Sequence, residues 1–169
     1  MPRIDWSRQN GRFAPPREKW MQRLLDDAVV LVDEREQEPW EFKHTRRVRL
    51  EVGDYSAVVA GEDLRRVFVV ERKASPSEFL EMVGRERERW ERELLALGGV
   101  PHAMVICEFS LQDLEQETLG RKIALAAVWG SLISWQVCYG VPILFAGSRE
   151  TAAGAFWKAL ELVVRTQLF

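Results

Sequence analysis

Apolar residues fall into short runs that charged or turn-forming residues separate. Aliphatic and β-branched residues dominate segments 28–36, 67–73, 103–109 and 141–147, whereas segment 47–52 alternates polar and apolar positions. Such runs predict buried or half-buried strands, because successive side chains on a strand point to opposite faces. We therefore expect a sheet of about five to six strands.

Helix signals lie between and after these runs. Segment 76–98 opens with a proline and ends at a glycine pair, segment 114–139 ends at a glycine, and segment 149–167 carries apolar residues along one face. Helices that alternate with strands favour partly parallel strands and right-handed crossovers. The shorter links between the first three strands suit a meander. The expected fold class is α/β, with a central mixed β-sheet flanked by helices on both faces.

The composition is that of an ordinary folded domain. The chain has 169 residues, with 24 Lys and Arg against 26 Asp and Glu and a formal net charge of −2. A chain of this length buries roughly two thirds of its unfolded surface in one core. The charge balance excludes a polybasic protein that binds through overall charge, but it permits local basic patches. We expect a basic N-terminal arm over residues 1–19, with local charge +3, and a single domain over residues 20–169.

Neither secretion nor a membrane span is expected. Cys107 and Cys138 lie in apolar surroundings, as free thiols in a reducing compartment do. The first residues lack the apolar region of a signal peptide. Glycine, serine and glutamine interrupt the longest apolar stretch, at 123–141, too often for a membrane helix. We expect a soluble protein of the cytoplasm or nucleoid, with no membrane partner.

The strand predicted for 67–73 ends in Glu71, Arg72 and Lys73. Because strand side chains alternate, Glu71 and Lys73 face one way and Arg72 the other. A carboxylate can hold a hard cation such as Mg²⁺, and an adjacent lysine can orient or polarise a water molecule. This pairing suits phosphodiester hydrolysis, in which a metal offsets developing charge and supplies hydroxide at neutral pH.

More carboxylates end the two preceding strands. Asp54 follows Gly53, whose backbone freedom permits a bend that aims the carboxylate inward, and Asp33 and Glu36 end the first strand. If these strands pair, the acidic side chains meet at one sheet edge and offer a third oxygen ligand. Charged strand ends that simply reach solvent are the alternative, and for an isolated Glu-x-Lys pair they are the better interpretation.

Three motifs resemble, in order and spacing, those of the XPF-type nuclease family. They are VDERE (32–36), VGDYS (52–56) and VERKASPS (70–77), against a family pattern of V-D-x-R-E, G-D-Y and E-R-K-x-x-x-D. The resemblance covers about residues 28–167 and includes an arginine-rich helix, GRERERWERELLAL. It implies a restriction-endonuclease-like fold. It also implies a metal-dependent DNA endonuclease that acts on branched or junction-containing DNA in repair, recombination or replication.

The resemblance also implies roles for individual residues. Asp54 and Glu71 bind Mg²⁺ or Mn²⁺ in the family pattern, and Lys73 positions the attacking water. Arg72 matches the family arginine that supports the site or contacts phosphate.

The upstream motif adds Asp33 and Glu36 to the metal ligands, with Arg35 between them as a supporting residue. The chain departs from the third motif, since Ser77 replaces its last aspartate. Either Glu78, one residue on, substitutes for this aspartate from the start of the helix, or that ligand is missing.

Basic residues near the predicted site are candidates for DNA binding. Segment 43–49 has four basic residues and no acidic one: Lys43, Arg46, Arg47 and Arg49. Such a patch grips the DNA backbone in a salt-dependent way, and the alternative is an exposed loop with incidental charge. We also expect Arg85 to contact phosphate. The other charges of 81–93 form i,i+4 pairs that favour a solvated helix.

The last two predicted helices carry many aromatic residues: Trp129, Trp135, Phe156 and Trp157. The family resemblance implies a homodimer through this C-terminal half, and a thick core is the alternative. A non-catalytic DNA-binding or partner subunit on the same fold is the rival function, which Ser77 favours slightly. A sequence-specific, restriction-like nuclease is a third, but no recognition domain is visible.

Overall fold

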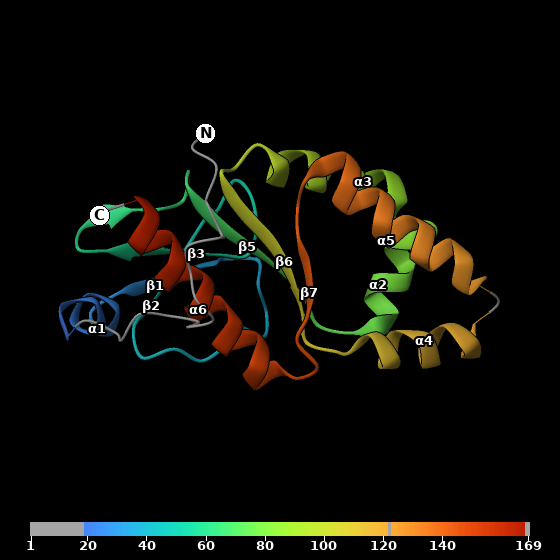
Figure 1. The fold of residues 1–169 in the computed structure, drawn as a ribbon, viewed down its shortest axis with the longest axis horizontal. Helices are drawn as coiled ribbons and strands as arrows, with labels where there is room; N and C mark the ends of the chain where they lie inside the picture. The colour runs from blue at the N-terminus through green and yellow to red at the C-terminus, as the bar shows by residue number, and fades with distance from the viewer. Residues whose placement is uncertain (1–18, 122, 168–169) are drawn as a thin grey trace, which may run out of the picture.

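The computed structural model describes residues 19–121 and 123–167, so the arm expected over residues 1–19 lies outside them except for Lys19. A central mixed sheet has helices on both faces, as predicted (Figure 1). None of the helices in these two ranges is long and apolar enough to cross a membrane.

Within the described residues, the sheet has seven strands: β1 (Val29–Asp33), β2 (Thr45–Val48), β3 (Tyr55–Val59), β4 (Glu62–Asp63), β5 (Phe68–Lys73), β6 (His102–Cys107) and β7 (Ile143–Phe145). Their order is β2-β1-β3-β5-β6-β7, and the short β4 pairs with β3. The pairs β1–β2, β5–β6 and β6–β7 are parallel, whereas β3 is antiparallel to both β1 and β5. The predicted meander is therefore wrong, because the chain leaves β1 for the outer strand β2 and returns to β3 on the other side of β1.

The helices are α1 (Lys19–Asp26), α2 (Pro76–Val83), α3 (Arg87–Gly98), α4 (Leu111–Gly120), α5 (Leu125–Tyr139) and α6 (Arg149–Gln167). Two predicted helices are each divided in two. Segment 76–98 breaks at Gly84, whose backbone leaves the helical region with ψ −112°. Segment 114–139 contains the end of α4 and all of α5. α4 starts earlier than predicted, because Ser110 and Asp113 form a capping box.

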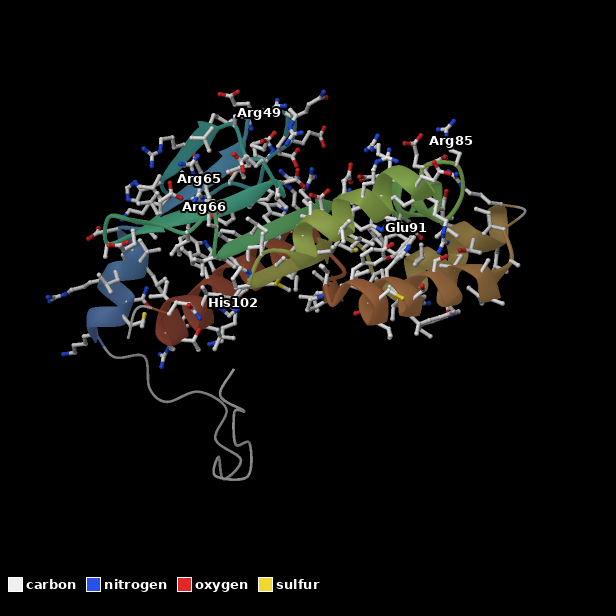
Figure 2. All side chains as sticks on the ribbon, turned by 90° about the horizontal axis from the view of Figure 1, so that it is seen from above. Arg49, Arg65, Arg66, Arg85, Glu91 and His102 are labelled. Atoms are coloured by element: carbon white, nitrogen blue, oxygen red, sulfur yellow. The ribbon has the colours of Figure 1, made fainter. Side chains whose placement is uncertain are left out.

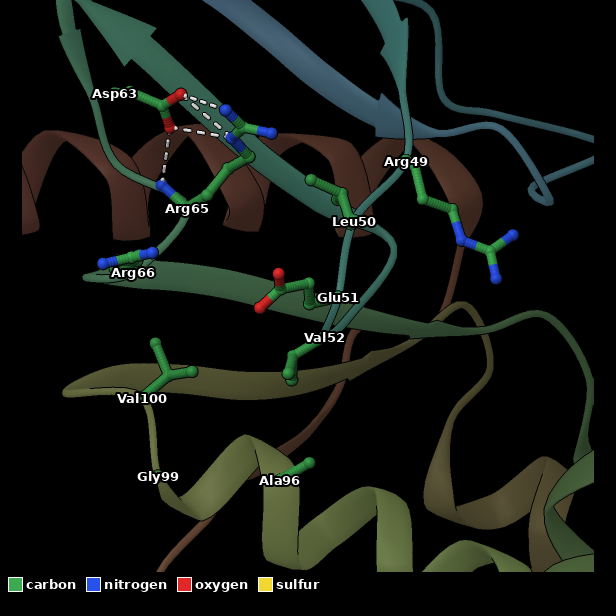
Figure 3. Close-up of a pocket in the computed structure, with 10 residues that line it drawn as sticks. All are labelled: Arg49, Leu50, Glu51, Val52, Asp63, Arg65, Arg66, Ala96, Gly99 and Val100. Atoms are coloured by element: carbon green, nitrogen blue, oxygen red, sulfur yellow. Dashed lines mark hydrogen bonds and ion pairs between the residues drawn. The ribbon is translucent and has the colours of Figure 1, made fainter.

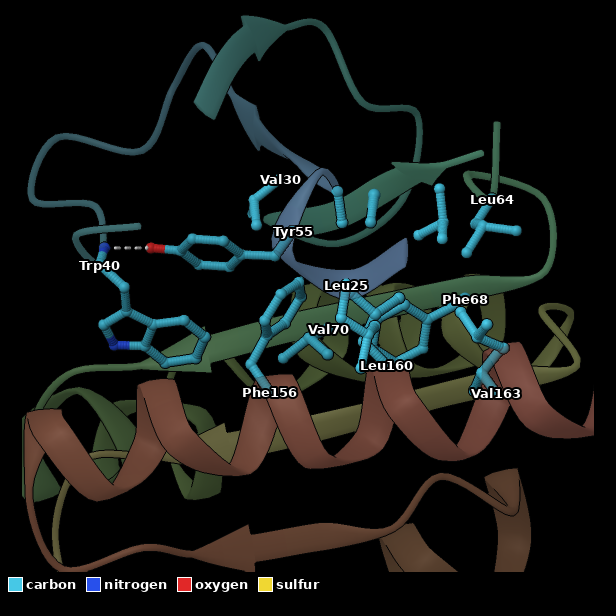
Figure 4. Packing of buried hydrophobic residues seen from close by; sticks show 14 of the residues in the cluster. Leu25, Val30, Trp40, Tyr55, Leu64, Phe68, Val70, Phe156, Leu160 and Val163 are labelled. Atoms are coloured by element: carbon cyan, nitrogen blue, oxygen red, sulfur yellow. Dashed lines mark hydrogen bonds between the residues drawn. The ribbon is translucent and has the colours of Figure 1, made fainter. Parts of the chain in front are cut away.

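Two hydrophobic cores lie on opposite faces of the sheet. α1 and α6 pack on one face, where Phe156 is fully buried among Trp40, Tyr55 and Phe68 (Figure 4). α2, α3 and α5 pack on the other face, and Trp135 lies at their centre. β5 contributes to both cores, so its side chains alternate between the α6 face and the α2–α3 face.

The loop before β3 differs from the sequence prediction and brings Asp54 to the site. β2 ends at Val48, so the strand expected at 47–52 is not continuous. Gly53 has φ +73°, and a Cβ there would lie 3.2 Å from the carbonyl oxygen of Val70. Asp54 therefore precedes β3 and does not end a strand. Because β3 runs antiparallel to β5, with Tyr55 opposite Val70, the start of β3 lies beside the end of β5.

Gly98 provides a test of how closely α3 and α5 pack. An added Cβ would lie 2.7 Å from the carbonyl oxygen of Tyr139 at the end of α5. Gly98→Ala should lower the free energy of unfolding by about 1–3 kcal/mol, because backbone must shift to accept the methyl group. Denaturant unfolding of the variant and the wild type measures this change.

Gly154→Ala is the matched control, since a Cβ at this position in α6 meets nothing within 4 Å. Alanine should stabilise this helix by about 0.5–1 kcal/mol. Equal stability of the two variants would show that the α3–α5 contact is looser than described.

Candidate functional site

The end of β5 places a carboxylate and an ammonium group side by side. Lys73 Nζ donates to Glu71 Oε1 at 2.8 Å and lies 3.3 Å from Glu78 Oε1. The side chains of Lys73 and Glu71 are only 6% and 13% exposed. The ammonium also lies 4.7 Å from the ring centroid of Trp90 in α3, at cation–π distance. These contacts hold Lys73 in one position.

Asp54 is fixed beside this pair by backbone hydrogen bonds. Its N–H donates to the Val70 carbonyl at 2.9 Å, and its Oδ2 accepts from the Arg72 N–H at 2.8 Å. Since Tyr55 and Val70 are paired, the preceding Asp54 and the following Glu71 share the opposite face of the sheet. The two carboxylates that the sequence places 17 positions apart thus converge.

Burial makes both carboxylates hard to ionise. Burial, together with the neighbouring Glu71 carboxylate, raises the pKa of Asp54 to about 8. Burial also raises the pKa of Glu71, although Lys73 opposes that shift. Burial alone would lower the pKa of Lys73, but Glu71 and Glu78 more than offset it, so the pKa lies above its ordinary value. Lys73 is therefore a cation at neutral pH.

The chemistry of this donor set fits a hard divalent cation. A cation between Asp54 and Glu71 would relieve their mutual repulsion, and carboxylate oxygens are the ligands that Mg²⁺ prefers. Over residues 19–121 and 123–167, no group of three or more His, Cys, Asp or Glu side chains is arranged to hold a metal. Two protein carboxylates would leave the remaining positions to water and substrate oxygens, as is usual for Mg²⁺.

Asp33, predicted as a metal ligand, has different partners. Its Oδ1 accepts from the N–H and Nε of Arg35 at 2.8 and 2.6 Å, and its Oδ2 accepts from the Leu50 N–H at 2.7 Å. Burial opposes ionisation, but the bonds from Arg35 and Leu50 lower the pKa of Asp33 below its ordinary value. Because protein donors occupy both oxygens, the geometry supports an anchor for the 49–54 loop in place of metal binding.

Arg72 points to the face opposite Glu71, as the alternation predicts. Its Nη1 lies 3.1 Å from Glu36 Oε1, and its Nε donates to Glu108 Oε1 at 2.7 Å. Glu108 also lies 3.3 Å from Nη1 of Arg149 at the start of α6. This network joins Glu36 to β5 and α6, so Arg72 supports the site from behind. Sequence patterns did not indicate Glu108 and Arg149, because these residues lie far along the chain from β5.

The converging residues line a cleft of about 400 Å³. The predicted residues on its wall are Arg35, Glu36, Asp54, Glu71, Arg72, Lys73 and Glu78. Two charged residues of α3 also line it, Arg89 and Glu93, and they form an ion pair at 3.1 Å. They belong to a run of charges that the sequence pattern explains as ion pairs within one solvated helix. Their position at the cleft follows only from tertiary packing.

Ser77 and Glu78 occupy the start of α2. Ser77 Oγ accepts from Arg121 Nη2 at 2.6 Å, so the residue that replaces the family aspartate has a structural partner. Glu78 reaches Lys73 with one oxygen and accepts the Ala74 N–H with the other, at 3.1 Å. Glu78 thus helps to hold Lys73 at the cleft.

The five predicted DNA-binding residues do not form one surface. Arg46 pairs with Leu31, which pairs with Ser56, and so Arg46 lies on the face that carries Asp54. Arg47 lies on the other face and donates to the Glu36 carbonyl at 2.6 Å.

Lys43 and Arg85 do not line the cleft that contains Asp54, Glu71 and Lys73. Lys43 lines a separate pocket against α1 and α6. Arg85 forms an ion pair with Glu81 at 2.7 Å, and Figure 2 shows it well apart from Arg49. Arg49 lines a second pocket, which shares Glu51, Val52 and Ala96 with that cleft.

Residues 32–155 match the family model described as the ERCC4 domain. Among solved structures, "XPF from Aeropyrum pernix" is similar with a TM-score of 0.59 and 17% identity, over 79% of this chain and 60% of that chain. "XPF from Aeropyrum pernix, complex with DNA" is similar with a TM-score of 0.59 and 18% identity, over 83% and 67%. No curated protein matches significantly. The chain spans about 60% of the first structure, and at this identity the likeness shows the shared fold.

Asp54→Asn should stabilise the protein in the absence of metal. The folded-state pKa of Asp54 is raised from 3.8 to about 8, so its contribution to stability falls as pH rises through this interval. Asparagine removes the buried charge and keeps an acceptor for the Arg72 N–H. With EDTA at pH 8, we expect this variant to have a higher melting temperature than the wild type. The increase should be about 2–4 °C for each kcal/mol gained in the free energy of unfolding. The gain should shrink toward pH 4.

Asp33→Asn is the matched control with the opposite sign. The pKa of Asp33 is lowered in the folded state, so its carboxylate stabilises the fold at pH values above the ordinary pKa. Removal of the charge removes this stabilisation. This variant should melt below the wild type at pH 8. If both variants lost stability, the repulsion inferred at Asp54 would be incorrect.

Proposed function

Because the chain belongs to the ERCC4 domain family, a family of DNA nucleases, we propose that it is a metal-dependent DNA endonuclease. The observation that carries the proposal is the convergence of Asp54, Glu71 and Lys73 at one end of the cleft. The proposed substrate is branched or junction-containing DNA, met in repair, recombination or replication. A similar structure solved as a complex with DNA supports DNA as the partner, and the branched or junction-containing form follows from the family resemblance alone.

Asp54 and Glu71 are the proposed ligands of Mg²⁺ or Mn²⁺. Such an ion, when bound, offsets charge on the phosphoryl oxygens and the leaving 3′-oxygen and lowers the pKa of a coordinated water. Lys73 remains protonated and donates hydrogen bonds, so it orients the attacking water and does not act as a general base. Glu78 and Trp90 keep the Lys73 ammonium in that position.

Cleavage assays test the catalytic assignment. Labelled fork, flap and four-way junction DNA are incubated with the protein and Mg²⁺ or Mn²⁺. Glu71→Gln and Lys73→Met should each lower the cleavage rate by at least about 10²-fold, because each removes a charge that the transition state requires.

Glu62→Gln, an exposed carboxylate of β4, is the control and should cleave as the wild type does. The assignment fails if the Glu71 and Lys73 variants match this control, or if the wild type cleaves none of the three substrates.

A non-catalytic DNA-binding or partner subunit is the second candidate. Two observations favour it: no larger metal-holding group was found in the described residues, and Ser77 bonds to Arg121 where the family has a carboxylate. Calorimetric titration with Mn²⁺ separates the two candidates. A binding site that Asp54→Ala removes supports the enzyme, and no site in the wild type supports the subunit.

We also infer a homodimer through the C-terminal half. Not all of the aromatic residues that suggested the dimer can lie in its interface, since Trp135 and Phe156 are fully buried in the two cores. α5 nevertheless exposes four apolar side chains at intervals of four residues, which gives one stripe: Leu125, Trp129, Ile133 and Val137. An exposed apolar stripe of this kind favours contact with a second molecule.

The double variant Ile133→Glu/Val137→Glu should be monomeric, since these side chains are 56% and 76% exposed and charge would oppose their burial in an interface. Sedimentation equilibrium measures the mass. Leu119→Glu on α4, at a side chain that is 82% exposed, should leave the dimer intact. A monomeric wild type would refute the dimer.

A further inference from the structure

A second cleft, of about 650 Å³ (Figure 3), lies next to the proposed catalytic cleft that contains Asp54 and Glu71. Its walls come from the 49–52 loop, the residues between β4 and β5, and the end of α3. Glu51, Val52 and Ala96 line both clefts. A ligand that occupies one can therefore continue into the other without leaving the surface.

Three arginines surround the second cleft. Arg65 is fixed by Asp63, whose carboxylate accepts bonds of 2.7–3.0 Å from its guanidinium and its backbone N–H (Figure 3). Arg49 and Arg66 are exposed and make no side-chain hydrogen bond or ion pair with any residue in the described ranges. Their guanidinium groups are available to a ligand.

Among the described arginines, guanidinium groups without a partner are the minority. Most arginines of the described part form ion pairs with carboxylates: Arg35, Arg65, Arg72, Arg85, Arg87, Arg89, Arg121, Arg149 and Arg165. Those without a side-chain hydrogen bond or ion pair are Arg23, Arg46, Arg49, Arg66 and Arg92. Arg49 and Arg66 line the second cleft, and Arg46 is close enough to lower the pKa of Asp63.

The charge around the cleft is positive on balance. Arg46 and the three arginines of the wall face two carboxylates, Glu51 and Asp63, and Arg65 already pairs with Asp63. Val52, Ala96 and Val100 add an apolar surface between these charges. Guanidinium groups bind phosphate through paired N–H donors, and apolar side chains suit the sugars that separate successive phosphates.

We propose that this cleft binds the sugar–phosphate backbone of the DNA strand whose scissile phosphate lies beside Asp54 and Glu71. The proposal rests on the proposed nuclease function and adds the path of the strand beyond the scissile phosphate. Arg49 and Arg66 contact phosphates, whereas Arg65 is positioned by Asp63 at the rim. Glu51 lies where the two clefts meet and weakens binding by repulsion.

Binding without cleavage measures these contacts separately from catalysis. The parent protein is the Glu71→Gln variant with Mg²⁺, and the probe is fluorescent flap DNA in anisotropy titrations over a range of salt concentrations. Adding Arg49→Ala/Arg66→Ala should weaken binding by about tenfold or more at low salt. The plot of the logarithm of the association constant against the logarithm of the salt concentration should also become less steep. Its slope should change by about 1.4–1.8, the value for two lost phosphate contacts.

Arg23→Ala/Arg92→Ala in the same parent is the matched control. It removes two exposed arginines that also lack ion pairs but lie on α1 and α3, away from the wall of this cleft. Its affinity and slope should remain close to those of the parent. Glu51→Gln should change affinity in the opposite direction and tighten binding. Circular dichroism and thermal unfolding check that each variant keeps its fold.

The outcomes distinguish this proposal from the function on which it rests. If the parent binds DNA but Arg49→Ala/Arg66→Ala behaves like the Arg23/Arg92 control, the strand path is wrong and the nuclease function stands. If the parent binds no DNA at any salt concentration, the proposed function fails and the strand path fails with it.

Discussion

The burial of Asp54 next to Glu71 is the constraint on which the site depends. Two carboxylates in a poorly solvated position destabilise the fold unless something compensates their charge. The chain supplies partial compensation from Lys73, 2.8 Å from Glu71, and from the Arg72 N–H, 2.8 Å from Asp54. Burial and the charge that remains uncompensated raise the pKa of Asp54, and the metal proposed above would compensate that charge. A loss of stability that accompanies perturbed pKa values is typical of active sites.

Two networks of hydrogen bonds and ion pairs keep Asp54 and Glu71 in place. Asp33 and Arg35 hold the loop that leads to Asp54, through the N–H and the carbonyl of Leu50. Behind β5, Arg72 connects Glu36 with Glu108, and Glu108 contacts Arg149. The first motif, VDERE, therefore acts mainly through the backbone that it fixes. This explains how an acidic residue can belong to the motif without an oxygen free for metal.

Local patterns were enough to predict how the side chains of one strand are oriented, whereas the family resemblance was needed to treat them as a site. Alternation along β5 put Glu71 and Lys73 on one side and Arg72 on the other, and an apolar run defined the strand itself. The convergence with Asp54 was also expected, but by a different route, since β3 begins and does not end at this point. The central mixed sheet and its covering helices followed from the same periodicity.

Features that depend on distant pairing could not be read from the sequence. The order of β1, β2 and β3 is set by which edges pair, and short links alone favour a meander. Glu108, Arg89 and Glu93 come to the site through β6 and α3, and their local patterns resemble those of any charged strand end or helix. The break at Gly84 was missed because the charges on either side both suit a helix.

The net charge of −2 leads to the last step of the argument. A protein with more acidic than basic residues cannot attract DNA through its total charge, so binding must depend on where positive charge is left uncompensated. Along α3, carboxylates neutralise Arg87 and Arg89, and at the end of α2 Glu81 neutralises Arg85. Around the second cleft, Arg49 and Arg66 keep their full charge. The distribution of ion pairs, more than the number of basic residues, therefore marks the face on which a phosphate backbone is most favourably placed.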